Sequence, residues 1–377
     1  MCNEFVPNPM ERPDYTFYHT PTIAEMRQRA IAAMRDLLSV QWTTHKKIAH
    51  SKSGAVSGKR FIYEPFITHA GLPYTNGGKG LFQFMEYYDT ETGRLQFYGT
   101  PEEFNEAIGC TCAGGVMWGL SSVCHTLNGK FINFCMTPKF GCYPVGDYKI
   151  DGNIENYREE FQTSRIIREN GVDLIIDAYT KIQPADAVTS SDKDHTMMCI
   201  DYPVVVRTED GSIDMAQSYV MVQDQRGGFK MGFYDVRVGD DLLHYSGRTE
   251  FKYTFQMLLD EFYIPLTTKE FMGEEPYERA KITFSDPCCT TREQLIAGTV
   301  TSNYPMALIK LNLIAHNGRR VMLDRYLFDR IDPYTGLARS FPMDRMSQAI
   351  INADGRALEV EVTAPNGEIL IPITINL

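Results

Sequence analysis

A glycine-rich segment with two cysteines, residues 109–118 (GCTCAGGVMW), holds the residue types best suited to chemistry in this sequence. Thr111 can act as the N-cap of a following helix, which would place Cys112 in the first helical turn. A thiol at that position feels the positive end of the helix dipole, which stabilises the thiolate and lowers the pKa. Backbone amides of the same turn can stabilise an oxyanion on an attacked carbonyl. The segment therefore predicts a cysteine nucleophile.

The predicted helix is unusually rich in glycine. Gly114, Gly115 and Gly119 each cost about 1 kcal/mol of helix stability relative to alanine. Such a cost commonly reflects the close approach of another backbone, and a strand that carries a catalytic base would fit. From this segment alone, a buried helix with incidental cysteines is an equally open interpretation.

A cysteine nucleophile needs a base whose pKa lies near the working pH, and histidine is the natural choice. His195 directly follows the polar turn 190–194 and opens an apolar run that predicts a strand. A histidine at a strand entrance can project into a cleft that faces the cysteine helix. The alternative is a surface histidine whose hydrogen bonds are satisfied locally.

Zinc binding is a second interpretation of the cysteines. The candidate ligands would be Cys110 with Cys112, and Cys288 with Cys289. Neither pair has the C-x2-C spacing of structural zinc sites, and no His-x3–5-His pair accompanies them. We therefore expect no metal and no cofactor.

Three segments in a fixed order precede His195: residues 71–78 (GLPYTNGG), 112–116 (CAGGV) and 183–186 (QPAD). Together with the histidine they resemble the NlpC-type papain-like cysteine peptidases, which are bacterial cell-wall endopeptidases. The resemblance extends over residues 70–225. It implies an α+β fold in which N-terminal helices pack on an antiparallel β-sheet.

The resemblance also implies roles for individual residues. Cys112 would be the nucleophile and His195 its base, and Tyr74 would line the site near the oxyanion. A third polar residue should orient the imidazole from the end of the next strand, predicted over 219–225. Gln225 is our choice for this residue, and Asp224 is the close second.

Two further residues beside the nucleophile, Thr111 and Trp118, are predicted to contact substrate together with Tyr74 and Asp224. The chain departs from the family pattern at Thr111 and Ala113, where Asp and Ser usually hold the peptide, and at Ala185, where Gly is usual. These changes argue against the usual cell-wall peptide but leave thiol chemistry intact. A protein that binds without turnover and an acyltransferase with the same Cys-His pair stay open as alternatives.

Composition limits the partners. The 377 residues carry a formal net charge of −11, which argues against nucleic acid and anionic membranes. No run of about 18 apolar residues predicts a transmembrane helix. Nine scattered cysteines indicate reduced thiols rather than a disulfide framework. We expect a peptide or small amide substrate; the oligomeric state is not indicated.

The chain divides into three predicted regions. Residues 1–58 form an N-terminal extension and a helix, which begins with the capping-box spacing Thr22-Ile23-Ala24-Glu25. Residues 59–280 form the hydrolase domain. Residues 285–377 form a C-terminal β-sandwich domain of short strands separated by Asn-Gly and Asp-Gly turns.

The N-terminus lacks the features of a secretory signal, which favours the cytoplasm. If a signal was removed, the protein is instead extracellular or in the cell wall.

Overall fold

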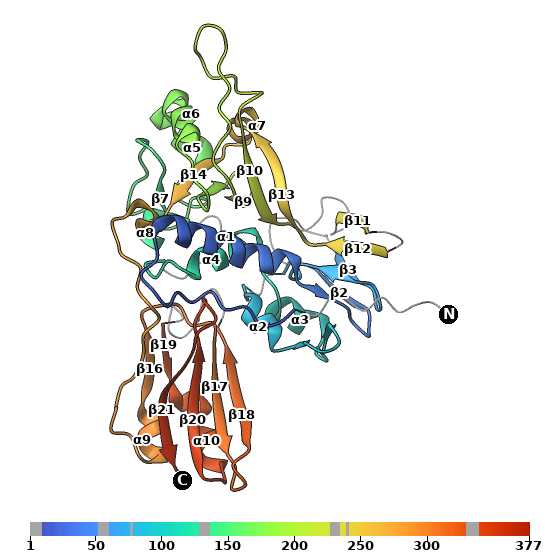
Figure 1. Cartoon of the computed structure of the whole chain (residues 1–377), viewed down its shortest axis with the longest axis vertical. Coiled ribbons are helices and arrows are strands. Elements are labelled where there is room, and N and C mark those ends of the chain that lie inside the picture. Colours follow the sequence, from blue (N-terminus) through green and yellow to red (C-terminus); the bar gives the residue numbers. More distant parts are fainter. Residues whose placement is uncertain are drawn as a thin grey trace.

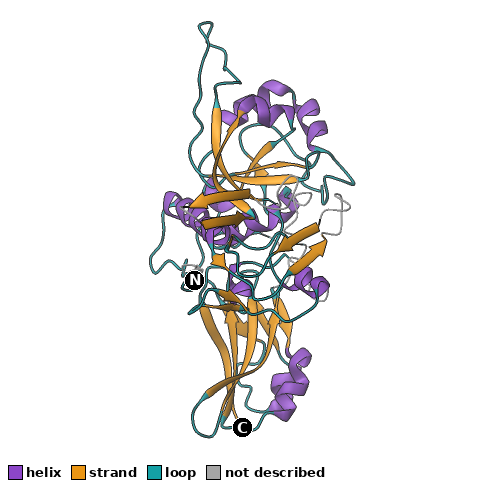
Figure 2. Ribbon diagram, turned by 90° about the vertical axis from the view of Figure 1, so that its right-hand side faces the viewer, coloured by secondary structure: helices purple, strands orange, loops and turns teal. Residues whose placement is uncertain are grey.

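The computed structural model describes residues 10–51, 60–75, 78–127, 136–226, 234–238, 241–328 and 339–377. It is a mixed helix and sheet structure of the α+β kind, as predicted. Two parts follow one another along the long axis, with the strands of the C-terminal part running lengthwise (Figures 1 and 2). In the described residues, none of the helices has both the length and the apolar character needed to span a membrane.

A six-stranded sheet with only antiparallel neighbours lies at the centre of the first part. Its strand order is β13-β10-β9-β8-β14-β7. The strands are β7 (Tyr143–Pro144), β8 (Ala187–Ser190), β9 (His195–Cys199), β10 (Tyr219–Gln225), β13 (Gly247–Thr254) and β14 (Ile264–Thr267). The strand predicted over residues 219–225 is thus confirmed at both ends.

Two helices, α1 (Ile23–Ser39) and α4 (Cys112–Ser121), pack against each other and against strands of this sheet (Figure 1). The predicted capping box is present, because Thr22 and Glu25 exchange side-chain and backbone hydrogen bonds. A Cβ on Gly119 would lie 2.7 Å from the Ala30 carbonyl oxygen of α1. The close backbone approach predicted from the glycines therefore comes from α1, and it fixes the position of α4.

Helix α1 shares one continuous hydrophobic core with α4. The boundary predicted after residue 58 therefore does not separate two cores, since the N-terminal helix is part of the same packed unit. A buried ion pair strengthens this attachment: Arg27 of α1 lies 2.8 Å from Asp186, just before β8. Asp186, the last residue of the segment 183–186, thus holds α1 against the sheet.

The residues between β7 and β8, and those after β13, form helices that contribute to a second core. These are α5 (Thr163–Asn170), α6 (Val172–Thr180) and α7 (Phe255–Asp260). Strand alternation separates the two cores, because Met197 and Cys199 join the second while Met198 joins the first. The sheet is therefore covered on both faces.

Shorter elements complete the first part. They are β1 (Gln41–Trp42), β2 (Ile48–Ser51), β3 (Arg60–Tyr63), β4 (His69–Ala70), α2 (Leu81–Met85), β5 (Tyr88–Asp89), β6 (Arg94–Leu95), α3 (Pro101–Ala107), η2 (Pro138–Phe140), β11 (Tyr234–Val238), β12 (Asp241–Tyr245) and α8 (Lys269–Met272). A four-stranded sheet has the order β1-β4-β12-β11, while β2 pairs with β3 and β5 with β6.

The C-terminal part contains a three-stranded sheet, β15-β16-β19, and a four-stranded sheet, β18-β17-β20-β21. Residues of both sheets share one hydrophobic core. The elements are β15 (Ile282–Phe284), α9 (Arg292–Ala297), β16 (Thr299–Ser302), β17 (Leu308–Ile314), β18 (Arg320–Leu327), β19 (Ser340–Pro342), η3 (Met343–Met346), α10 (Ser347–Asn352), β20 (Ala357–Thr363) and β21 (Ile369–Asn376).

Asn-Gly turns connect two of the strand pairs, as predicted from the sequence. Gly318 joins β17 to β18 at φ +82°, and Gly367 joins β20 to β21 at φ +88°. Glycine adopts such left-handed backbone angles without a steric penalty.

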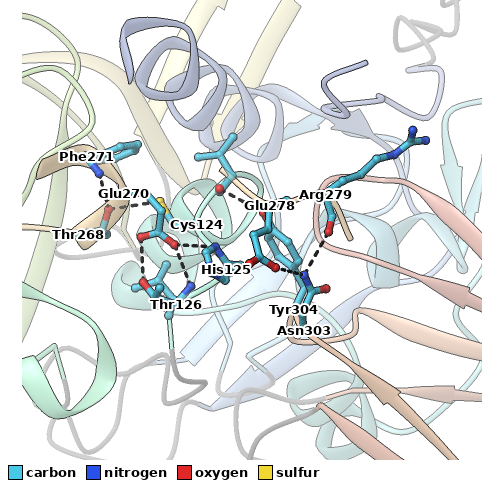
Figure 3. A network of polar contacts seen from close by, with 12 residues as sticks. Cys124, His125, Thr126, Thr268, Glu270, Phe271, Glu278, Arg279, Asn303 and Tyr304 are labelled. Carbon is cyan, nitrogen blue, oxygen red and sulfur yellow. Dashed lines mark hydrogen bonds and ion pairs between the residues drawn. The ribbon is translucent and has the colours of Figure 1, made fainter. Parts of the chain in front are cut away.

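One of the contacts between the two parts lies at the segment that follows α4 (Figure 3). Tyr304 Oη of the C-terminal part donates hydrogen bonds to the carbonyl of Val123 at 3.2 Å and to that of Glu278 at 2.7 Å. Arg339 Nη2 donates to the carbonyls of His125 and Leu127 at 2.5 and 2.6 Å. The C-terminal part thus satisfies backbone carbonyls at the exit of the cysteine helix.

Candidate active site

The nucleophile candidate is the first residue of α4. Thr111 is the N-cap, and its side chain accepts a hydrogen bond from the Gly114 amide at 3.4 Å. Cys112 therefore lies at the positive end of the helix dipole, as predicted. Its side chain is almost covered, with 3% of the residue exposed, and Sγ lies 3.9 Å from the Asp194 carbonyl oxygen.

His195 meets Cys112 from the sheet. It is the first residue of β9, and the preceding Asp194 has a left-handed backbone at φ 52° that turns the chain into the strand. Burial by itself would lower the pKa of His195. Hydrogen bonds to Asp224 and Cys112 outweigh burial and raise the pKa to about 9. The imidazole is therefore held in its charged form beside the sulfur.

Asp224 orients the imidazole. Its Oδ2 lies 2.9 Å from His195 Nε2, and its side chain is fully buried. Burial would raise the pKa of Asp224, but hydrogen bonds from Arg248 and His195 hold that pKa well below its usual range. A permanently charged carboxylate at Nε2 leaves Nδ1 as the nitrogen available to the sulfur. Because Asp224 is sequestered in this way, the prediction that it contacts substrate is not supported.

Gln225 does not orient the imidazole, and this choice from the sequence is corrected. Its Nε2 donates to the Leu72 carbonyl at 2.6 Å, and its Cβ lies 3.1 Å from the place of a Cβ on Gly115. Neighbouring residues of a strand point to opposite faces, so only one of Asp224 and Gln225 can meet the histidine. Gln225 instead fixes the Leu72 backbone against the cysteine helix.

Sequence reasoning missed Arg248. Its Nε and Nη2 donate to both oxygens of Asp224, at 2.9 and 2.6 Å. Nothing in the sequence near Arg248 marks it, because its place opposite Asp224 depends on an irregular strand register. The only available signal was a basic residue on a strand that follows the one bearing the carboxylate.

Tyr74 lies beside the nucleophile candidate. The segment that carries it runs beside residues 109–110: Tyr74 forms a parallel bridge with Cys110, whose amide donates to the Pro73 carbonyl at 3.2 Å. Burial, and then the charge and hydrogen bond of Cys112, raise the pKa of Tyr74 far above its usual value. The hydroxyl therefore stays protonated and can donate to an oxyanion. Gly77 of the same motif lies outside the described residues.

Trp118 and Thr111 have structural positions. The Trp118 ring packs against Phe82, with 5.0 Å between ring centroids, and only 5% of the residue is exposed. A Cβ on Gly80 would collide with the same ring. The ring is therefore part of the hydrophobic core, and its contact with substrate stays a prediction. Thr111 caps the helix and is 8% exposed, so its direct role is to hold Cys112 at the helix start.

Ala185, which replaces the usual glycine of the resembled family, has a left-handed backbone at φ 69°. Glycine is the residue that adopts this angle without strain. The angle turns the backbone just before Asp186, which anchors α1.

Within the residues that the structure describes, no group of three or more His, Cys, Asp or Glu side chains is placed to hold a metal ion. Cys288 is exposed and Cys289 is buried, both in the C-terminal part. No family model, curated protein or solved structure matches the chain. The geometry of Cys112, His195 and Asp224 therefore carries the functional argument.

Proposed function

We propose that this chain is a cysteine hydrolase of the papain-like, NlpC-type kind that acts on an amide bond. The observation that carries the proposal is the Cys112 thiol at a helix start, hydrogen-bonded to an imidazole that Asp224 orients. The antiparallel sheet packed against α1 and α4 supports the same family. The left-handed backbone of Ala185, just before Asp186, also supports membership of this family.

The reaction would proceed by acyl transfer through the sulfur. The Cys112 thiolate attacks the carbonyl carbon and forms a tetrahedral intermediate, whose oxyanion the Cys112 amide and the Tyr74 hydroxyl stabilise. The His195 imidazolium donates its proton to the leaving amine as the C–N bond breaks, which leaves a thioester. Neutral His195 then takes a proton from water, which attacks the thioester and releases the acid and the thiolate.

The substrate would be a peptide or a small amide. Thr111 caps the helix rather than offering a carboxylate, and Ala113 offers no hydroxyl. A substrate other than the usual cell-wall peptide therefore fits this chain better. We also propose that the two C-terminal sheets form a β-sandwich that docks the substrate or covers the site.

The alternative is a papain-like binding protein without turnover, and the low exposure of the site motivates it. Cys112 is 3% exposed and His195 is 9% exposed. A substrate can reach such a sulfur only if the surrounding groups move aside. An acyltransferase would use the same Cys-His pair and pass the acyl group to an amine or a thiol instead of water.

An activated ester, p-nitrophenyl acetate, separates these functions. For a hydrolase we expect p-nitrophenol to be released over many turnovers, with a transient acetyl group on Cys112 found by peptide mass spectrometry. Cys112→Ser should abolish both signals, and Cys288→Ser is the matched control because Cys288 is an exposed thiol. Acetylation that never turns over supports the binding protein. Turnover only with an added amine or thiol supports the acyltransferase, and label on Cys288 instead of Cys112 would contradict all three.

A further inference from the structure

Arg248 makes a two-pronged contact with the carboxylate behind the histidine. Nη2 of Arg248 and Nε2 of His195 both meet Oδ2 of Asp224, at 2.6 and 2.9 Å, and Nε of Arg248 meets Oδ1 at 2.9 Å. The two cations therefore share one buried anion. Bidentate pairing of this kind fixes the plane of a carboxylate as well as its position.

An irregularity in the sheet brings Arg248 to this place. Val222 of β10 pairs with Phe251 of β13, but Asp224 pairs with Arg248, so β13 has one residue more than β10 between the two pairs. A regular register would have put Thr249 opposite Asp224. Bulges commonly redirect a side chain beside a functional site.

The same bulge places Phe251 under the guanidinium. The Arg248 Cζ lies 3.7 Å from the centroid of the Phe251 ring. The ring holds one face of the guanidinium while Asp224 holds its edge. Only 15% of the Arg248 side chain is exposed, so the contact with Asp224 is largely protected from screening by solvent.

We propose that Arg248 is a positioning residue that sets the acid strength of the His195 imidazolium by sharing the charge of Asp224. This inference rests on the proposed cysteine chemistry. The Arg248 cation neutralises part of the charge of the same carboxylate. Asp224 therefore stabilises the protonated form of His195 less strongly. The imidazolium is then a stronger acid toward a leaving amine than it would be with an unshared carboxylate.

Other charged and titratable groups near His195 come from each neighbouring element. They are Cys112 of α4, Tyr74 before it, Asp194 in the preceding turn, Asp224 of β10 and Arg248 of β13. Of these, Arg248 is the cation that contacts Asp224, so its removal takes positive charge from the cluster and leaves Asp224 and Cys112 in place. Tyr263, which precedes β14, also interacts with Cys112, and Arg226 interacts with Tyr263; both are unchanged in the variant.

The test is the pH profile of Cys112 alkylation by iodoacetamide, whose alkaline inflection reports loss of the His195 proton. In Arg248→Gln we expect this inflection to move up by about one pH unit, because Asp224 then acts on the imidazolium alone. Arg248→Lys keeps the charge, so its inflection should stay closer to that of the unsubstituted protein. Arg320→Gln removes a similar strand arginine, paired with Glu359 at 2.9 Å, and should leave the profile unchanged.

The outcomes separate this inference from the function on which it rests. If the unsubstituted protein shows no selective Cys112 alkylation, the proposed function fails. If it does, but Arg248→Gln and Arg248→Lys both keep the original inflection, or Arg248→Gln lowers it, the role of Arg248 is overturned. Should Arg248→Gln not fold, Arg248→Met, which also removes the charge, decides: an inflection displaced upward supports sharing, and an unchanged one contradicts it.

Discussion

The two ends of helix α4 carry the same residue types but differ in the sign of the helix dipole and in the atoms that each side chain contacts. Cys112, His195 and Asp224 meet at its start, while Cys124, His125 and Glu270 meet just beyond its end (Figure 3). The positive end of the helix dipole favours thiolate at Cys112, whereas the negative end disfavours it at Cys124.

The partners in the second cluster differ as well. Cys124 Sγ lies 3.3 Å from Thr268 Oγ1, and burial followed by the charge of Glu270 raises the pKa of this thiol far above its usual value. His125 Nδ1 lies 3.2 Å from Glu270 Oε1, and Glu270 also accepts from the amide and hydroxyl of Thr126. Glu270 thus holds the backbone at Thr126 in place by hydrogen bonds, and the Cys124 thiol stays protonated.

The comparison teaches that cysteine, histidine and carboxylate in proximity do not define a thiol enzyme. Position along the helix dipole and the atom that each group contacts decide the chemistry. At Cys112 the imidazole contacts the sulfur, and at Cys124 a threonine hydroxyl does.

The largest difference between the two clusters should appear when the acid of each, Asp224 or Glu270, is replaced by its amide. Asp224→Asn should reduce p-nitrophenyl acetate turnover by about 100-fold, because the amide no longer stabilises the imidazolium. The measurement is the initial rate, with folding checked by circular dichroism. Asp192→Asn is the matched control, since Asp192 lies near His195 in sequence but instead accepts from Ser164 at the start of α5. Equal rates for Asp224→Asn and the unsubstituted protein would remove Asp224 from the mechanism.

The counterpart substitution at the other end, Glu270→Gln, should leave turnover within about twofold while lowering the free energy of unfolding by ~1–3 kcal/mol. The loss comes from the buried donors of Thr126, which would face an amide group. Chemical denaturation with urea measures it. A strong loss of turnover in a fully folded variant would show that the second cluster takes part in the chemistry.

The next largest effect is expected in the pH dependence of the free energy of unfolding at the first cluster. The pKa of His195 is raised from 6.5 to about 9, so its stabilising contribution is fully present below about pH 6.5 and is lost as pH rises to about 9. We expect the stability difference between the unsubstituted protein and His195→Gln to shrink over this range. Urea denaturation at both ends of it is the measurement, and a difference that grows with pH would have the wrong sign.

The smallest effect is expected at the joint between the two parts. Tyr304→Phe removes the hydroxyl that donates to the Val123 and Glu278 carbonyls and should lower the free energy of unfolding by about 1 kcal/mol. Cys112 alkylation should be unchanged. Slower Cys112 alkylation in a folded Tyr304→Phe variant would mean that the joint controls the site.

The sequence allowed the local features of the site to be predicted. Thr111 as N-cap, Cys112 in the first turn and His195 at the start of a strand all follow from short-range patterns. These features depend on neighbouring residues, so a single sequence carries them. The α+β class and most strands of the C-terminal part were predictable for the same reason.

Long-range register could not be predicted. Whether Asp224 or Gln225 meets the imidazole depends on which face of β10 turns toward β9's first residue, and Arg248 depends on a bulge in β13. The position of Trp118 could not be predicted either, because an aromatic beside a nucleophile can face either substrate or core. Its neighbour Gly80, distant in sequence, decides for the core.

The central claim, that the Cys112 sulfur is held as a reactive thiolate by His195, is tested most directly by iodoacetamide labelling at about pH 6. Peptide mass spectrometry should find label on Cys112 about tenfold or more faster than on exposed Cys288, with none on buried Cys124. In His195→Ala the preference for Cys112 should disappear. Labelling that begins at Cys288 and is unaffected by His195→Ala would contradict the account.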